Sequence, residues 1–469
     1  MTITGPWQRA ANGANLLTDG VVQPTIFARM SGLAAQLGAM NLGQGFPDTQ
    51  PPAAVARAAM DEIANGANQY PPGPGRPELR EAIARHQERF YGSPVDPSSE
   101  ILVTTGATEA IAATILAFVR PGDEVLTLEP YYDSYAAMIA LAGGAHRTVR
   151  LDVHGGAEPA AAREDTTGEQ LPEPDEHGAS ARTGAPLEAG TAARAGAQAA
   201  ASAGTGTGPE LTISADARAI VDAIGPRTRM ILLNTPHNPT GILLDRATLQ
   251  AVVDAAREND AIVVVDEVYE HLVFDGEHAA TTSLDGWRDV AIGIGSAGKT
   301  FSTTGWKIGW TIASAEHTAA ITAVKQWLTF ATGSPFQRAI AAGLDMPDAD
   351  YAAIRDDLRE RRDRLVGILR SVGARVSVPA AGYFVIADLS PLGEEDGAAL
   401  CERLPHEAGV VAIPVSAFCR HPLHEVDELH EGPEPVDPFA PLVRFAFCKD
   451  DATLDEAERR LRAWAERRG

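Results

Sequence analysis

The middle of the chain alternates short apolar runs with helical patterns, and this alternation constrains the fold more than any other feature. Helical spacing fills most of the gaps, for example at 108–119 and 245–259. Continuously apolar strands that alternate with helices are typical of a mostly parallel sheet buried on both faces. The sequence therefore predicts an α/β fold with helices covering the sheet. The strand-like runs are 100–106, 123–130, 146–153, 229–236, 261–268 and 289–296.

The segments before and after this alternation have other sequence patterns. Residues 22–38 have helical spacing and lead into a Gly/Pro loop, NLGQGFPD. After about residue 331 the chain turns to long charged helices with β segments YFVIADL and LVRFAFC. We predict an N-terminal arm, 1–45, that is also part of a small domain. A large cofactor-binding domain, 46–330, and a small C-terminal α+β domain, 331–469, follow it.

One segment interrupts the pattern. Residues 155–210 contain no Val, Ile, Phe, Tyr, Trp, Met or Cys, and Leu171 and Leu187 stand isolated. Such a segment cannot bury enough apolar surface to offset the entropy lost on ordering. We predict a disordered Ala/Gly-rich insertion between a strand ending near Val153 and a helix starting at Ser214. A regulatory docking segment is the alternative.

Composition excludes several classes of function. The chain has 469 residues and a net charge of −24, which disfavours nonspecific binding to nucleic acid or anionic membranes. Its three cysteines fit neither a disulfide scaffold nor a metal pattern, which indicates a reducing cytoplasm. The first twenty residues lack the features of a signal peptide, and no apolar run is long enough to span a membrane. We expect a soluble cytoplasmic protein without metal, membrane or nucleic-acid partners.

Three reactive side chains follow buried strands. Asp266 ends the run AIVVVD, Tyr269 comes three positions later, and Lys299 lies in a small polar loop after DVAIGIG. A carboxylate keeps a pyridine nitrogen protonated, a phenol bonds a ring oxygen, and an amine bonds an aldehyde. This set predicts a site for an aldehyde-bearing pyridine.

A phosphate site is predicted beside it. Gly106-Ala107-Thr108 lies where a strand turns into a helix, and free amides at a helix N-terminus bind phosphate. Ser296 and Lys307 flank the reactive lysine and can add a hydroxyl and a cation. An ordinary helix start at Thr108 and a solvated surface position for Lys307 remain alternatives.

Three further residues fit the same chemistry. Asn238, in the turn NTPHNPTG, can donate to a ring oxygen and a substrate carboxylate. Tyr132 in EPYYDSY offers a ring to stack on a planar cofactor, although packing of Tyr131 or Tyr132 in the core or at an interface is an alternative. Arg444 lies inside the apolar run LVRFAF, where its fork suits a carboxylate or an internal salt bridge.

Together these motifs identify a family. The chain resembles class I aminotransferases of the fold type I pyridoxal-phosphate superfamily. It is especially similar to the branch with kynurenine/glutamine transaminases and actinobacterial N-succinyldiaminopimelate aminotransferases. The likeness covers most of 22–465 outside the insertion. It rests on NLGQGFPD, NQYPPGPG, VTTGATEAI, EPYYDSY, NTPHNPTG, DEVYEHLVF, SAGKTFSTTGWKIGW, IPVSAFC and VRFAFCKDD.

The resemblance implies roles for the residues already named. Lys299 bonds the aldehyde of pyridoxal 5′-phosphate and moves the proton, while Asp266 pairs with the pyridinium. Tyr269 and Asn238 bind the ring oxygen, and Tyr132 stacks on the ring.

It also implies contacts beyond the cofactor ring. Gly43 contacts the substrate through its backbone, and Arg444 clamps the α-carboxylate. Tyr70 reaches the phosphate of the neighbouring subunit, which makes the enzyme a homodimer with shared sites. Lys307 stands where many relatives have Arg, so the phosphate depends more on the helix terminus.

Four functions are compared. The first is a ping-pong aminotransferase acting on an amino acid and a 2-oxo acid, with N-succinyldiaminopimelate and 2-oxoglutarate/glutamate as the favoured pair, a step of lysine biosynthesis. Alternatives on the same scaffold are a kynurenine/glutamine transaminase and a cysteine-S-conjugate β-lyase. A transcription regulator would need an N-terminal DNA-binding domain, and no basic helix-turn-helix precedes residue 22.

A second carboxylate on the favoured substrate needs its own cation. The loop 419–440, with Arg420, His421 and His424, is one candidate, and a solvated Pro-rich acidic loop is the alternative.

Overall fold

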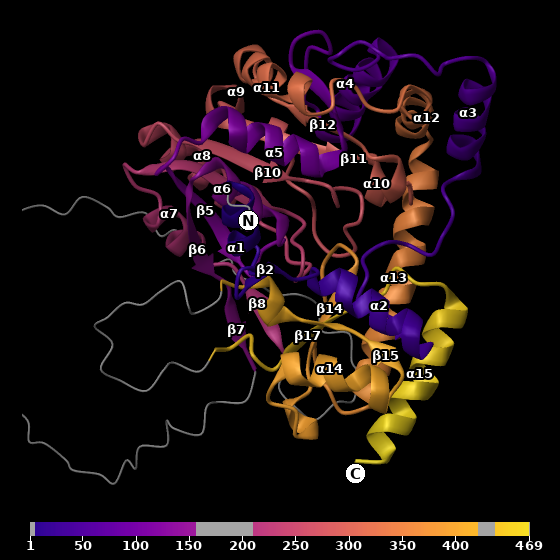
Figure 1. Cartoon of the computed structure of the whole chain (residues 1–469). Helices are drawn as coiled ribbons and strands as arrows, with labels where there is room; N and C mark the ends of the chain where they lie inside the picture. Colours follow the sequence, from indigo (N-terminus) through magenta and orange to yellow (C-terminus); the bar gives the residue numbers. More distant parts are fainter. Residues whose placement is uncertain (1–4, 156–209, 421–436, 469) are drawn as a thin grey trace, which may run out of the picture. The chain divides into compact units, whose positions relative to one another are not determined.

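The computed structural model describes residues 5–155, 210–420 and 437–468 (Figure 1). Apart from its two end residues, the predicted insertion at 155–210 lies outside these ranges, as do His421 and His424. The described residues all belong to one compact unit. No helix within them is long and apolar enough to cross a membrane.

A seven-stranded sheet forms the larger part of this unit. Its order is β4-β12-β11-β10-β9-β5-β6, and every pairing is parallel except those that β12 makes with β11 and β4. The prediction of a mostly parallel sheet is confirmed. The strands are β4 (Ile101–Thr105), β5 (Glu124–Glu129), β6 (Ala145–Arg150), β9 (Thr228–Asn234), β10 (Ile262–Asp266), β11 (Ala291–Ser296) and β12 (Ile308–Ile312).

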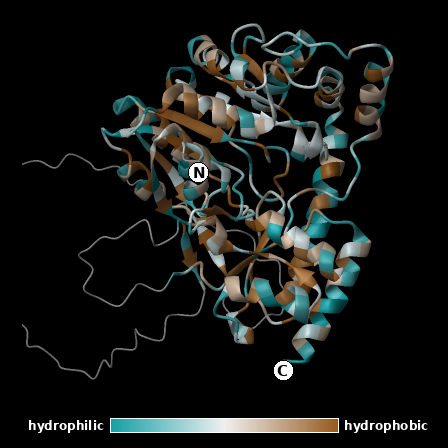
Figure 2. Ribbon diagram, in the orientation of Figure 1, coloured by the Kyte–Doolittle hydropathy of each residue, from teal (hydrophilic) through white to brown (hydrophobic). Residues whose placement is uncertain are grey.

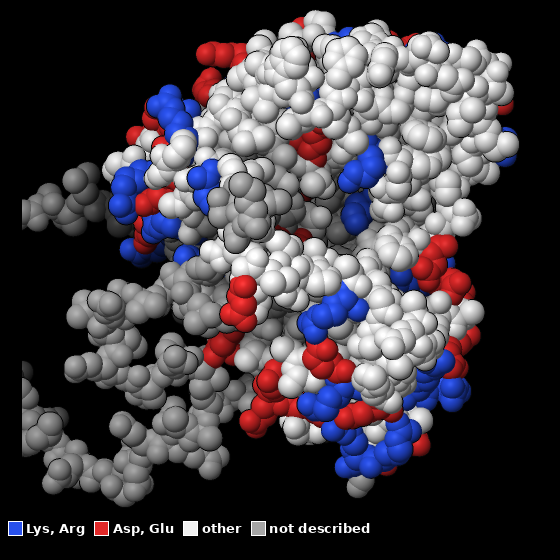
Figure 3. All heavy atoms as spheres, in the orientation of Figure 1, with Lys and Arg blue, Asp and Glu red and all other residues white. Residues whose placement is uncertain are grey.

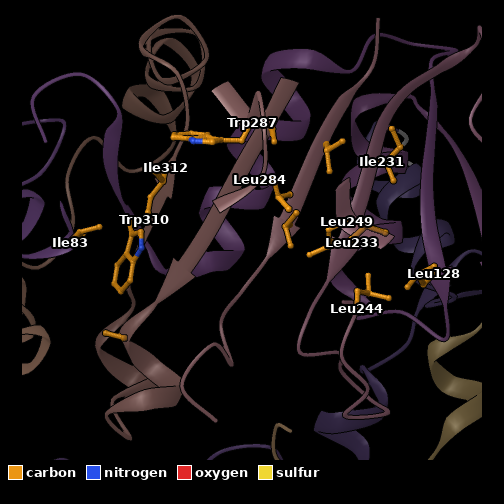
Figure 4. Packing of buried hydrophobic residues seen from close by; sticks show 14 of the residues in the cluster. Ile83, Leu128, Ile231, Leu233, Leu244, Leu249, Leu284, Trp287, Trp310 and Ile312 are labelled. Atoms are coloured by element: carbon orange, nitrogen blue, oxygen red, sulfur yellow. The ribbon is translucent and has the colours of Figure 1, made fainter. Parts of the chain in front are cut away.

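Helices cover both faces of the sheet, which explains why its strands are apolar throughout. Successive side chains of a strand point to opposite faces, so Val263 and Val265 of β10 pack with one apolar cluster and Val264 with the other. The first cluster includes Leu249 of α8 (Arg246–Glu258), shown close to Leu233 in Figure 4. The second includes Ile111 of α5 (Gly106–Phe118). Hydrophobic colour accordingly follows the strands in Figure 2.

A second sheet of four antiparallel strands lies in the C-terminal part of the chain. Its order is β13-β14-β17-β16. Helix α2 packs with its apolar cluster, and β3 pairs in parallel with β15, so the N-terminal arm joins this part. The elements are α2 (Ile26–Leu37), β3 (Met40–Asn41), α13 (Asp348–Ser371), β13 (Arg375–Ser377), β14 (Phe384–Asp388), α14 (Gly397–Glu407), β15 (Val410–Val411), β16 (Ile413–Pro414), β17 (Leu442–Ala446) and α15 (Asp451–Glu466).

The remaining elements complete the layers on the faces of the large sheet or connect its strands and the two sheets. They are α1 (Trp7–Gly13), β1 (Leu17–Thr18), β2 (Val21–Val22), α3 (Ala53–Ala64), α4 (Pro77–Tyr91), α6 (Ser134–Ala142), α7 (Ala217–Asp222), α9 (Trp287–Val290), α10 (Ala297–Thr300), α11 (Ala315–Leu328), α12 (Ser334–Leu344) and the short 3₁₀ turns η1 (Thr281–Ser283), η2 (Thr304–Trp306), η3 (Ser390–Leu392) and η4 (Val415–Phe418).

Two expectations about local structure are wrong. The run 146–153 is not one strand, because β6 ends at Arg150 and β7 (Asp152–His154) pairs instead with β8 (Thr212–Ser214). Ser214 therefore ends a strand rather than starting a helix. Helix α7 begins after Asp216, whose carboxylate accepts hydrogen bonds from the first free amides.

Candidate active site

A cavity of about 190 Å³ lies at the carboxyl ends of the large sheet's central strands. Residues from β9, β10 and β11 and from the start of α5 line it. Ten of the predicted site residues meet here: Gly106, Ala107, Thr108, Tyr132, Asn238, Asp266, Tyr269, Ser296, Lys299 and Lys307.

Lys299 enters the cavity from α10, the short helix that follows β11. The hydroxyl of Ser296 caps this helix by accepting from the Gly298 amide at 3.2 Å. The Lys299 amine donates to the Gly45 carbonyl at 2.9 Å. Burial lowers the pKa of the Lys299 amine to about 8, so a neutral, nucleophilic amine is accessible near neutral pH.

Asp266 ends β10 with its carboxylate held from two sides. Tyr135 donates to Oδ2 at 2.7 Å, and the Val268 amide donates to Oδ1 at 3.3 Å. Burial raises the pKa of the Asp266 carboxyl to about 6, although both hydrogen bonds favour the charged form. A cation bound beside it would favour the carboxylate further, which suits a protonated pyridine nitrogen.

Two asparagines link the ends of β9 and β10. Asn234 Nδ2 donates to the Asp266 carbonyl at 2.8 Å, and Asn234 Oδ1 accepts from the Asn238 amide at 2.6 Å. The Asn238 side chain in turn accepts from Arg444 Nη1 at 3.1 Å. Asn238 therefore lies between the Asp266 side of the cavity and Arg444.

The start of α5 forms an open cradle. Its N-cap, Thr105, makes no side-chain cap hydrogen bond, so the first amides of the helix are left for another acceptor. A Cβ on Gly106 would lie 3.4 Å from Lys307 Nζ, and one on Gly309 would lie 2.7 Å from the Ala107 nitrogen. Because both positions are glycine, no side chain blocks these amides or the Lys307 amine, and they stay free to bind an anion. Lys307 is both exposed and part of the cavity wall.

Arg444 lies next to the cavity, buried in β17. Its Nη2 donates to the Gly43 carbonyl at 2.8 Å, which joins the two predicted substrate contacts. The guanidinium also lies over three rings, those of Phe27, Phe384 and Phe418, at 5.3, 3.9 and 4.5 Å. Arg444 makes no ion pair with a described residue, and its Nε–H has no partner there. The internal salt bridge considered above is therefore not what holds it.

The tyrosines fall into different places. Tyr132 lines the cavity, whereas Tyr131 packs against His146 outside it, so Tyr132 is the one placed to stack. Tyr70 does not line its own chain's cavity. It is 85% exposed and makes an edge contact with Phe330, which is also exposed.

Sequence reasoning missed Asn234, Tyr135 and Thr304. Asn234 and Thr304 line the cavity, and Tyr135 holds Asp266. All three lie within or beside motifs already noted, NTPHNPTG, EPYYDSY and SAGKTFSTTGWKIGW. Nothing in the local pattern distinguished them from their neighbours.

The chain belongs to the aminotransferase class I and II family, whose model matches residues 38–161 and 207–431. It is a pyridoxal-phosphate-dependent aminotransferase of fold type I. A probable N-succinyldiaminopimelate aminotransferase of Mycobacterium tuberculosis is 43% identical over 94% of this chain and 96% of the relative. The methionine aminotransferase of Escherichia coli is 35% identical over 93% and 95%.

Solved structures agree with this assignment. The N-succinyldiaminopimelate aminotransferase from Mycobacterium tuberculosis superposes with a TM-score of 0.78 at 41% identity, covering 98% of this chain and all of that one. A Thermus thermophilus aspartate aminotransferase with maleate gives 0.74 at 26% identity, covering 98% of this chain and all of that one.

The cavity fits pyridoxal phosphate on its own chemistry. The uncapped start of α5 with Lys307 suits the phosphate, and the buried Asp266 suits the ring nitrogen. Lys299 supplies an amine for the aldehyde, and Tyr132 a ring beside the cofactor plane.

Proposed function

We propose that this enzyme transfers the amino group between N-succinyldiaminopimelate and 2-oxoglutarate/glutamate. The observation that carries the proposal is the 43% identity, over nearly the whole of both chains, to a relative named for that substrate. Arg444, unpaired at Nε beside the cavity, provides a cation for the α-carboxylate that both substrates share.

Lys299 is proposed as the group that moves the proton. When bound, pyridoxal phosphate supplies an aldehyde for the amine and a ring that takes up electrons from the substrate α-carbon. Lys299 then acts first as base and next as acid, with its lowered amine pKa favouring the base form. Because the amine is fixed in the site, no separate base has to be recruited from solution.

The other side chains are proposed to orient the reactants. Asp266, held by Tyr135, keeps the ring nitrogen protonated, and Tyr269 with Asn238 binds the ring oxygen. Arg444, whose Nη2 donates to the Gly43 carbonyl, holds the substrate carboxylate beside Gly43, so that the substrate α-carbon faces the amine of Lys299.

The remaining cofactor contacts are proposed on the same basis. Tyr132 stacks on the ring, and the phosphate lies against Gly106-Ala107-Thr108, Ser296 and Lys307. Domain boundaries near 46 and 331 would let the small C-terminal part close over this site.

A donor screen tests the substrate. In half-reactions followed by cofactor absorbance, N-succinyldiaminopimelate should react at least about tenfold more efficiently than kynurenine, glutamine or methionine, a difference of about 1.4 kcal/mol. A preference for kynurenine or for sulfur conjugates would overturn the substrate and leave the aminotransferase class intact.

Borohydride reduction tests the lysine. Reduction of the holoenzyme should bleach its visible band and fix the cofactor to the peptide that contains Lys299. A label on any other residue would overturn the proposed role.

We also propose a homodimer in which Tyr70 serves the partner's phosphate site. The face around α3, α11 and α12 carries few charged atoms (Figure 3), unlike the end near α14 and α15. Large apolar side chains are exposed on and near these helices: Met60, Ile63, Tyr70, Trp327, Leu328 and Phe330. A face with few charges and several exposed apolar side chains is typical of a subunit interface.

Complementation tests the shared site. Lys299→Ala and Tyr70→Ala subunits, unfolded and refolded together, should form mixed dimers in which one site has both residues. Activity should then exceed the sum of the separately refolded parents, up to about a quarter of wild type from random pairing. Activity no greater than that sum, or a monomer in light scattering, would contradict the proposal.

A cytoplasmic location is proposed from the three cysteines, which are all buried and unpaired. Cell fractionation that finds the enzyme outside the cytoplasm would contradict it.

A further inference from the structure

Tyr383 connects the small sheet to the loop that carries Lys299. It immediately precedes β14 and is almost fully buried. Its carbonyl accepts from the Phe447 amide at 2.9 Å, which ties it to the strand that carries Arg444. Its hydroxyl donates to the carbonyl of Lys299 at 2.5 Å. One side chain therefore fixes the main chain of the reactive lysine to the other sheet.

The ring of Tyr383 also faces the amine of that lysine. Lys299 Nζ lies 5.5 Å from the centre of the Tyr383 ring and 5.6 Å from that of Tyr269. The two rings meet edge to face at 5.5 Å. With the Gly45 carbonyl as the acceptor, they form three sides of an enclosure for the amine. Ring faces attract an ammonium group, so this enclosure favours one position for the Lys299 side chain.

We propose that Tyr383 is a positioning residue for amino-group transfer, whose hydroxyl and ring hold Lys299 in place while its amine is free of the cofactor. The inference rests on the proposed role of Lys299 as the proton carrier. Proton transfer requires the base within hydrogen-bonding reach of the substrate carbon, and a displacement of about 1 Å can cost two orders of magnitude. A free lysine side chain with four rotatable bonds would otherwise spend much of its time elsewhere.

Other groups also act on the amine, and the test has to separate Tyr383 from them. The charged and titratable groups that influence the Lys299 amine are Cys448, Arg444, Asp266 and Lys307. None of them is changed by a substitution at Tyr383.

Tyr383→Phe removes the hydroxyl and keeps the ring, and Tyr351→Phe is its matched control. Tyr351 is also buried, and its hydroxyl also donates to main-chain carbonyls, those of Gly343 and Leu344, at 3.3 and 3.2 Å. It lies in α13 and does not line the cofactor cavity. A loss that comes only from removing a buried tyrosine hydroxyl will appear in both variants.

The half-reaction of the holoenzyme with glutamate is followed by stopped-flow absorbance. In Tyr383→Phe the rate at saturating glutamate should fall on the order of tenfold, with the Kd for glutamate within about twofold of wild type. Tyr351→Phe should leave both within about twofold. A Tyr383→Phe rate within about twofold of wild type would overturn the proposal, as would a loss matched by equal losses of bound cofactor and thermal stability.

A second measurement does not depend on turnover. The rate of reductive methylation of Lys299 in the cofactor-free enzyme, measured by peptide mass spectrometry, reports how much of its amine is neutral and accessible to the reagent. Tyr383→Leu removes the ring that favours the ammonium form, so labelling should be several-fold faster than in wild type or Tyr351→Phe. An unchanged labelling rate would overturn the role of the ring. If borohydride labels a residue other than Lys299, the proposed function fails independently of either result.

Discussion

Two carboxylates near the end of β10 each accept a hydrogen bond from a tyrosine hydroxyl. Asp266 ends the strand, and Glu270 lies in the turn that follows it. On the cavity side Tyr135 donates to Asp266 at 2.7 Å, and on the core side Tyr91 donates to Glu270 at 2.6 Å. Both carboxyls are buried, and burial raises the pKa of Asp266 to about 6 and that of Glu270 to about 7. The direction and cause of the pKa shift therefore do not distinguish the two carboxylates.

Their surroundings differ. Asp266 borders the cavity, whose wall also carries the amines of Lys299 and Lys307. The core side is closed by rings, where His86 and His271 meet at 2.5 Å between their Nε2 atoms beside Phe90. Glu270 and these two histidines have donor atoms close enough to hold a metal ion, and burial lowers the pKa of both histidines, so their rings are neutral among the surrounding aromatic side chains. A perturbed pKa therefore marks a site only where a cavity adjoins it.

The largest expected effect tests the cavity side. Lys299→Ala should bind cofactor through Asp266 and the phosphate cradle, yet lose turnover by about a thousandfold or more, because no other amine lies at that position. Steady-state rates and the visible spectrum together check this. Retained turnover would show that another group moves the proton.

The second prediction compares the two carboxylates directly. Asp266→Asn should lower the half-reaction rate by about a hundredfold or more with a modest loss of cofactor affinity, because the charge that protonates the ring nitrogen is gone. Glu270→Gln should leave the rate within about twofold, because Glu270 does not reach the cavity. Equal losses of the half-reaction rate in the two variants, measured by stopped-flow absorbance, would contradict this difference between the two carboxylates.

The third prediction concerns the two tyrosine partners. Tyr135→Phe removes one hydrogen bond to Asp266 and should lower the half-reaction rate by about fivefold to tenfold, roughly 1 kcal/mol. Tyr91→Phe should lower thermal stability by a similar free energy and leave the rate within about twofold. Melting curves and half-reaction rates on the same preparations decide whether the two hydroxyls differ as stated.

The fourth prediction is a pH dependence of stability, which does not change the rate of the reaction. Burial raises the pKa of Glu270 from 4.5 to about 7, so the folded protein retains a proton that the unfolded chain releases. Its contribution to stability is complete below about pH 4.5 and is lost as the pH rises through about 7.

Glu270→Gln cannot titrate at this position, so its free energy of unfolding should fall by about 2 kcal/mol less than that of wild type between about pH 5 and pH 8. His86, whose pKa is lowered to about 3, and His271 titrate alike in both proteins, so the difference isolates Glu270. Parallel melting curves across this range would contradict the raised pKa.

The sequence by itself predicted six strands of the large sheet and most of the residues that meet at the candidate site. Asp266 ends β10 and Ser296 ends β11, where a continuously buried apolar run gives way to polar side chains, so the local pattern located these strand ends. Parallel strands end at one edge, which brings together residues as distant as Thr108 and Lys299. Strand β12 had no such signal, because its apolar run begins one residue after the turn η2. Its place between β4 and β11 depends on pairing with strands that lie elsewhere in the chain.

Only the tertiary structure decided which neighbours hold the reactive groups. Tyr135 meets a carboxylate 131 positions away, and Tyr383 meets a carbonyl 84 positions away, and no local pattern encodes either contact. Tyr91, at the end of α4, and Tyr135, in α6, are both helical tyrosines that donate to a carboxylate, yet one faces the core and the other the site. The physical reason is that side-chain type and periodicity fix which face of an element is buried, whereas the packing of distant elements fixes what that face contacts.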